Sequence, residues 1–316
     1  MGFLSSLFGK KETAEVKQAK LEKKNFEILK YDGMRARNMR KSEYAIKCFE
    51  EALALKEDAE IYAMLASTYM QTGKTLEARE TLEKLIGKEP ENTNALISLA
   101  GLCFLMEDYK SMLGYSNKAI ETDGNNATAL YLAGKANKNM SRGIEAIVNL
   151  SKAIAQKEDF IEAYQLRAET LLSMGQDGEA MKDTEQILSI DENNEDALIL
   201  KSELLIKEKK EEEARKILET ICELNPFNNK AYILKANIMV ERDDYDGAIR
   251  IYDSAIEMME SDAVLYEERG RIKLLKGDKD GSMEDMKKAM ELNPEKMEEV
   301  NEKFAGIKTN SGTSIY

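Results

Sequence analysis

The sequence contains no histidine and no tryptophan, and it has only three prolines among 316 residues. Without histidine the chain cannot build a serine–histidine triad, an imidazole general base or a histidine-ligated metal site. The scarcity of proline, which breaks helices more strongly than any other residue, favours a helical chain. Apolar residues make up 43% of the chain, enough for a folded core. These absences predict a non-catalytic protein.

Cysteine is also scarce. Cys48, Cys103 and Cys222 are odd in number, widely spaced and free of any CxxC pair. A structural zinc site needs four ligands, and a secreted disulfide framework shows an even count. We therefore expect reduced thiols in a cytoplasmic protein that binds no metal and no cofactor.

Charge is unevenly distributed along the sequence. Residues 1–47 carry twelve Lys or Arg and six Asp or Glu, a net charge of +6, which leaves −19 for the rest of the chain. A body this acidic repels a phosphate backbone, which argues against nucleic acid as the main partner and against an RNA-binding helical repeat. It suits a basic or amphipathic protein segment instead.

Residues of the same kind recur every 34 positions, after a first step of 33. Large apolar residues form one column: Leu29, Tyr62, Leu96, Leu130, Tyr164, Leu198, Tyr232 and Tyr266. Four positions later comes a column of Gly, Ala or Ser: Gly33, Ala66, Ala100, Gly134, Ala168, Ser202, Ala236 and Gly270. A third column is mostly small: Ala45, Ala78, Met112, Ala146, Ala180, Ala214, Ala248 and Ser282.

The spacing within one interval predicts two helices. Tyr62, Ala66 and Tyr69 share one helical stripe, and Ala78 opens a matching stripe on a second helix after a turn. Small residues in both stripes let antiparallel helices approach closely. One such pair cannot bury its apolar face alone, so neighbouring pairs must stack into a solenoid.

This pattern resembles the tetratricopeptide repeat. The family's sequence signature is matched by Tyr62, Leu65, Ala66, Tyr69, Ala78, Leu82, Leu85 and Pro90. The resemblance implies an all-α fold, a right-handed α-solenoid of about eight 34-residue helix-turn-helix units plus a C-terminal capping helix. We expect residues 25–294 to form the eight repeats, starting near residues 26, 59, 93, 127, 161, 195, 229 and 263. Residues 295–305 are expected to form the cap, and 306–316 a disordered tail.

In this family the first helices line a concave groove that binds protein segments. The resemblance therefore implies a scaffold or adaptor whose partner is a protein or peptide, basic or amphipathic. The candidate groove residues are Ile97, Phe104, Tyr131, Glu162, Glu169, Leu172, Asp196, Ile199, Glu203, Ile206, Ile233, Val240, Glu241 and Leu274. The alternative for each apolar member is packing against the next repeat.

The N-terminal segment, residues 1–24, is amphipathic and basic. Its membrane-contact candidates are Phe3, Leu4, Leu7, Phe8, Lys10 and Lys11. The apolar side chains share one side of a helix and lysines follow, a combination that suits a membrane interface. A frayed terminus or an additional cap explains the same residues. The rival function is therefore an assembly or secretion factor held at the cytoplasmic membrane face by residues 1–11.

Three motifs resemble functional sites without completing them. Gly73-Lys74-Thr75 lacks the preceding glycine and strand of a phosphate loop, which makes it an inter-helix turn. Glu211-Glu212-Glu213 lies between basic residues and predicts a solvated helix face. Lys30 matches the first lysine of the family's carboxylate clamp for chaperone tails, but Met34 stands where the clamp needs asparagine.

Overall fold

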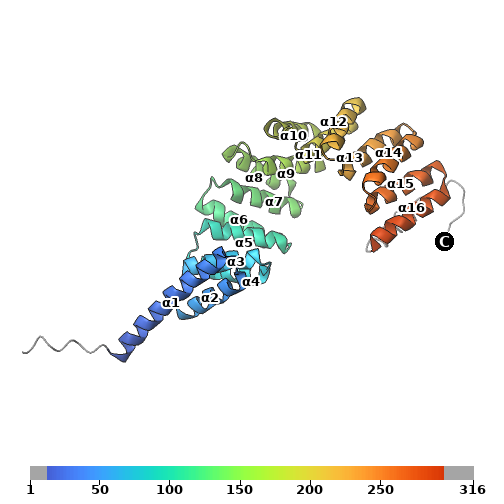
Figure 1. The fold of residues 1–316 in the computed structure, drawn as a ribbon. Helices are drawn as coiled ribbons and strands as arrows, with labels where there is room; N and C mark the ends of the chain where they lie inside the picture. The colour runs from blue at the N-terminus through green and yellow to red at the C-terminus, as the bar shows by residue number, and fades with distance from the viewer. Residues whose placement is uncertain (1–12, 295–316) are drawn as a thin grey trace, which may run out of the picture. The chain divides into compact units, whose positions relative to one another are not determined.

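Within residues 13–294, which the computed structural model describes, the chain forms sixteen helices and no strand (Figure 1). The helices are α1 (Ala14–Asn38), α2 (Ser42–Leu55), α3 (Ala59–Gln71), α4 (Thr75–Lys88), α5 (Thr93–Leu105), α6 (Tyr109–Thr122), α7 (Ala127–Asn139), α8 (Gly143–Gln156), α9 (Ile161–Ser173), α10 (Asp177–Ile190), α11 (Glu195–Lys207), α12 (Glu211–Leu224), α13 (Asn229–Glu241), α14 (Tyr245–Met258), α15 (Ala263–Lys276) and α16 (Lys279–Leu292). They form two compact units, which divide between Thr170 and Leu171.

Each repeat is a pair of helices, with an odd-numbered first helix and an even-numbered second helix. An asparagine or aspartate caps most of the first helices. Its side-chain oxygen accepts a hydrogen bond from a backbone N–H in the first turn, where an α-helix has no internal partner for its N–H groups. Asn92, for example, accepts from the Ala95 N–H at 3.0 Å. The caps recur with the repeat, at Asp58, Asn92, Asn126, Asn194, Asn228 and Asp262.

The turn inside each helix pair depends on one residue with a positive φ angle. Gly73, Gly175 and Gly277 supply it in three pairs, with φ of 73°, 73° and 96°. In the other five pairs a residue with a side chain takes the same left-handed conformation: Arg40, Glu107, Ser141, Lys209 and Asp243. The pairs turn in the same way whether or not glycine is present, because the backbone geometry is fixed by the helices on both sides.

The two helices of a pair meet where a small residue faces a large one. A Cβ atom on Gly33 would lie 2.6 Å from the Phe49 ring, and one on Gly134 would lie 2.7 Å from Cγ of Leu150. Large residues hold six of the eight positions that lie sixteen residues after the small column: Phe49, Leu82, Leu150, Leu218, Tyr252 and Met286. Ser116 and Thr184 hold the other two, and all eight residues are buried.

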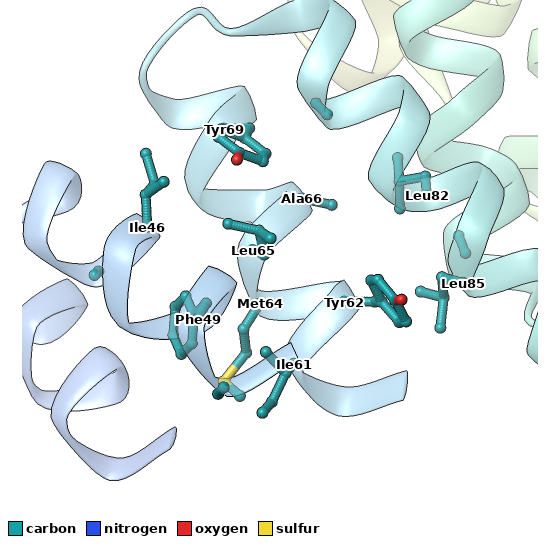
Figure 2. Packing of buried hydrophobic residues seen from close by; sticks show 14 of the residues in the cluster. Ile46, Phe49, Ile61, Tyr62, Met64, Leu65, Ala66, Tyr69, Leu82 and Leu85 are labelled. Atoms are coloured by element: carbon teal, nitrogen blue, oxygen red, sulfur yellow. The ribbon is translucent and has the colours of Figure 1, made fainter. Parts of the chain in front are cut away.

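Stacking of one pair on the next completes the core. In the first unit, Phe49 of α2 packs with Ile61, Met64 and Leu65 of α3, and Leu82 of α4 belongs to the same cluster (Figure 2). Ile61 is fully buried, because it lies between its own pair and the preceding one. The apolar stripe of α3 therefore belongs to two interfaces, within the pair and between pairs.

The third repeat replaces a small residue with a large one. Met112 lies where the other repeats carry Ala or Ser, and it is fully buried with Ala100, Cys103 and Ala136. The small partners leave room for the longer side chain, so the substitution is accommodated by complementary volumes.

The predicted all-α fold of stacked helix-turn-helix units with a 34-residue step is confirmed by the helices. Helix α1 begins at Ala14, well before the expected start of the first repeat near residue 26. The expected capping helix at 295–305, the tail at 306–316 and the membrane-contact candidates in residues 1–11 lie outside the described residues.

Candidate partner-binding surface

One column of the first helices is apolar at most positions without being fully buried. Its members are Arg37, Met70, Phe104, Lys138, Leu172, Ile206, Val240 and Leu274, which follow the small column by four positions. Every residue of the small column is buried, whereas each member of this column keeps part of its side chain exposed. We call the surface formed by this column and the residues three to seven positions before it the first-helix face.

In the first unit, this face carries a chain of aromatic rings and lysine. The Lys135 ammonium of α7 lies 3.6 Å from the centre of the Phe104 ring of α5 and 6.0 Å from that of Tyr131. Tyr131 in turn packs against Phe160, with ring centres 5.1 Å apart. Burial, and then the nearby Lys138 charge, lowers the pKa of Lys135. Burial raises the pKa of Tyr131, and the carboxylates of Glu162 and Glu169 add to this effect.

Two other lysines on the first-helix face of this unit are paired. Lys138 binds Glu169 across α7 and α9, and Lys30 binds Glu60 across α1 and α3. Lys135, in contrast, forms no ion pair with any described residue. The structure thus leaves one cation of this face on an aromatic ring and without a carboxylate.

Glycine interrupts the same face at α5. A Cβ atom added to Gly101 would meet no atom within 4 Å. Ile97 and Phe104, one turn away on either side, are half-buried, and Leu105 is 70% exposed. On α3, Met70 is 43% exposed. The open space at Gly101 is therefore bordered by apolar side chains.

In the second unit, the predicted apolar residues differ in how far neighbouring repeats cover them. Ile206 packs partly against one core cluster, Ile233 and Val240 pack partly against another, and Leu274 is half-buried. Ile199 is only 4% exposed and belongs to the core. Its expected place on an open surface is wrong, because it belongs to a core cluster with residues of α12 and α13, which is the alternative of packing between repeats.

The predicted acidic residues of the second unit lie on the same helices as these apolar residues, and two of them form ion pairs. Glu203 forms an ion pair with Lys230 at 2.9 Å, and Glu241 pairs with Lys209 at 3.6 Å. Asp196 is exposed. Pairs of this exposure contribute little to stability, so a cation from a partner can replace the internal one at small cost.

The motifs that resembled functional sites are structural. Gly73-Lys74-Thr75 forms the turn between α3 and α4, and Lys74 pairs with Glu43 at 3.1 Å. Arg242 pairs with Glu211 and Glu212 in the first turn of α12. The described residues hold no cluster of three or more Cys, Asp or Glu side chains arranged for a metal ion. None of the helices described here is long and apolar enough to span a membrane.

Comparison with known protein families identifies the repeat. Two family models described as tetratricopeptide repeat match the sequence, one at residues 178–238 and the other at 59–92, 161–194 and 263–296. Both models describe helical repeats rather than a catalytic domain. No curated protein matches the sequence.

Several solved structures share the fold. A tetratricopeptide repeat protein from Parabacteroides merdae ATCC 43184 is 20% identical, with a TM-score of 0.64 over 77% of this chain and 96% of its own. PilF of Pseudomonas aeruginosa is 20% identical, with a TM-score of 0.56 over 68% of this chain and 96% of its own. PilW, described as a type IV pilus biogenesis factor, is 17% identical, with a TM-score of 0.56 over 65% and 96%. These structures share the fold of this chain. The two family models, the helix pairs and their 34-residue step show that the chain is a tetratricopeptide repeat protein.

Proposed function

We propose that this protein is a non-catalytic adaptor that binds a segment of another protein along its first-helix face. The observation that carries the proposal is the partly exposed apolar column, which is apolar in six of its eight members. A position that only packs the core becomes buried, as the small column does at all eight positions. A position that only faces water does not favour large apolar residues such as Phe104, Ile206 or Val240.

The apolar and charged residues of the second unit have separate roles in this proposal. Removal of Ile206, Val240 and Leu274 from water supplies most of the affinity, because burial of apolar surface is the main favourable term in association. Glu203, Glu241 and the exposed Asp196 steer a basic or amphipathic segment to the surface, and their effect weakens with salt.

The composition of the chain and the surroundings of its cysteines do not support catalysis. The chain has no histidine, and the cysteine thiols are kept neutral because burial raises the pKa of Cys103 and Cys222. A thiol nucleophile needs the opposite shift. We therefore infer an adaptor rather than an enzyme.

The test of this function is a double variant, Ile206→Ser with Val240→Ser. We expect it to lose capture of the natural partner from an extract of the source organism while its helical circular dichroism remains. The control is Ile190→Ser with Leu224→Ser, which removes two exposed aliphatic side chains from the second helices α10 and α12. The control should capture the partner as the unmodified protein does.

The two outcomes that contradict the proposal are separable. If Ile206→Ser with Val240→Ser unfolds the array and the control does not, these side chains are core residues. If the double variant stays folded and captures every partner of the unmodified protein, binding takes place on another surface.

A second candidate function is attachment to a membrane surface, which α1 favours. The first part of α1 is exposed, and Val16 and Leu21 are 44% and 51% exposed beside Lys17 and Lys24. Lysines near an anionic lipid surface contribute to binding. Deletion of residues 1–24, which removes these side chains, should then abolish sedimentation with vesicles that contain phosphatidylserine. If the full chain does not sediment with these vesicles, this second function is excluded.

A further inference from the structure

The open space at Gly101 lies between apolar side chains and a cation. Gly101 occupies the same repeat position as Ser67 on α3 and Lys135 on α7, each 34 residues away. Its own helix contributes Phe104 and Ile97 at the adjacent turns, since residues three and four apart lie on the same helix face. A ligand side chain that enters at Gly101 therefore contacts aliphatic and aromatic surface and reaches the Lys135 ammonium.

The state of Lys135 indicates what kind of group belongs beside it. Its ammonium lies against the Phe104 ring at 3.6 Å and has no carboxylate partner among the described residues, whereas Lys138 and Lys30 are both paired. A ring face attracts a cation less strongly than a carboxylate does at a site that is partly shielded from water. A carboxylate that arrives here gains a charge-assisted hydrogen bond and breaks no existing ion pair.

We propose that the first-helix face of α3, α5 and α7 binds a protein segment in which a large apolar side chain stands beside a carboxylate, with the apolar group over Gly101 and the carboxylate on Lys135. This proposal rests on the proposed adaptor function and specifies its ligand in the first unit. Charge complementarity selects the acidic partner in the first unit, because Lys135 on this face has no ion pair with a described residue.

The third repeat is the only described repeat whose first helix carries glycine at this position. Glycine inside a helix lowers helix stability, and the absence of any neighbour within 4 Å means that close packing does not require it here. Gly33, Gly134 and Gly270, in contrast, are each in contact with a large side chain of the partner helix. The free space at Gly101 is accounted for by a ligand side chain that fills it.

The experiment uses a random heptapeptide library displayed on phage and the full chain as bait. One arm selects on the unmodified protein alone. The other first removes every phage that binds the Gly101→Leu variant, which fills the open space, and then selects on the unmodified protein. We expect the second pool to be enriched in sequences that place Phe, Leu or Met beside Asp or Glu.

Affinities of a selected peptide from the second pool then test the two contacts. Gly101→Leu and Lys135→Met should each weaken binding at least tenfold in fluorescence anisotropy, and Lys135→Met should also flatten the salt dependence. The matched control is Gly114→Leu on α6, where an added side chain likewise meets no atom within 4 Å. It should bind as the unmodified protein does, and all three variants should retain the helical circular dichroism signal.

Failure of this inference differs from failure of the adaptor function. If the first pool contains binders and the second is empty, or the second pool lacks acidic residues, the site at Gly101 is refuted and the adaptor function stands. If Gly114→Leu weakens binding as much as Gly101→Leu, the inference is also overturned. If neither pool contains a binder, the adaptor function itself is contradicted.

Discussion

The same substitution, glycine to alanine, should have opposite effects at two neighbouring first helices. At Gly101, a Cβ atom meets nothing within 4 Å. Gly101→Ala should therefore gain only the helix propensity of alanine, about 1 kcal/mol. At Gly134, the same atom would lie 2.7 Å from Cγ and 2.9 Å from Cδ2 of Leu150, which is fully buried. Overpacking of this kind costs about 1–3 kcal/mol.

Because the propensity gain is common to both variants, it cancels when they are compared. Gly101→Ala should exceed Gly134→Ala in free energy of unfolding by the overpacking cost alone, about 1–3 kcal/mol. Urea denaturation followed by circular dichroism measures this difference. Hydrogen exchange of residues 93–156 then localises it to the third and fourth repeats, since stability in a solenoid is approximately a sum over repeats and their interfaces.

A double-mutant cycle tests the named contact. Leu150→Ala removes both atoms that a Cβ on Gly134 would strike. Its cost of about 2–5 kcal/mol in the unmodified protein should therefore fall in the Gly134→Ala background. Equal shifts for the two glycine substitutions, or additivity in the cycle, would refute the close approach of α7 and α8 at this point.

Three further predictions concern the surroundings or backbone conformation of individual residues. Tyr252 is fully buried and its hydroxyl has no hydrogen-bond partner among the described residues, so Tyr252→Phe should raise the free energy of unfolding by about 1 kcal/mol; a loss of stability in urea would show that the hydroxyl is bonded. Ser141 has a φ of 60°, so Ser141→Gly should raise the free energy of unfolding in urea and Gly73→Ala should lower it, each by about 1 kcal/mol; free energies that change in the same direction would contradict this. Asp108 accepts a hydrogen bond from the Ser111 N–H at 3.1 Å, and its bonds to Ser111 lower its pKa, so its contribution is complete above about pH 4 and is lost as the pH falls through the folded pKa. Asp108→Asn should keep the cap and reduce the loss of stability in acid, and unchanged pH dependence of the urea midpoint would exclude this role.

The repeat could be predicted from the sequence because its cause is local and occurs many times. A small residue at Ala66 and a large one at Leu82 mean little in one interval, but the same pair of sizes recurs through the chain. Close helix approach favours this pattern, and six of the eight intervals carry it, so each of them is an independent test of the same physical requirement. The helix pairs and their 34-residue step were therefore visible before any coordinates.

Burial and side-chain contacts could not be predicted from the sequence for residues that are surrounded by several repeats. Ile199 and Ile233 share one repeat position and one side-chain type, yet the first is buried and the second is half-buried. What covers each one depends on neighbouring side chains, and no pattern within a single helix reports that. The contact of Lys135 with Phe104 could not be predicted for the same reason, although Phe104 was a candidate groove residue.

Backbone conformation was a further gap. The glycine at position 73 suggested a turn, but the left-handed turn residues Arg40, Glu107 and Lys209 carry no sequence signal of their own. The available clue was that their distance from Gly73 is close to a whole number of 34-residue steps, because a turn that recurs in every repeat keeps its geometry even when its residue changes.

Photo-crosslinking from matched exposed positions tests most directly whether the first-helix face binds the partner. A photoreactive benzoylphenylalanine replaces Leu105 or Leu275 on first helices, and Ile144 or Met258 on second helices. Leu105 and Ile144 are 70% and 67% exposed, and Leu275 and Met258 are 45% and 43% exposed, so each pair is equally accessible. The adaptor function predicts that the first-helix positions form a crosslinked product with a partner from the source organism, and that the second-helix positions do not. Equal or stronger crosslinking from Ile144 and Met258 would contradict it.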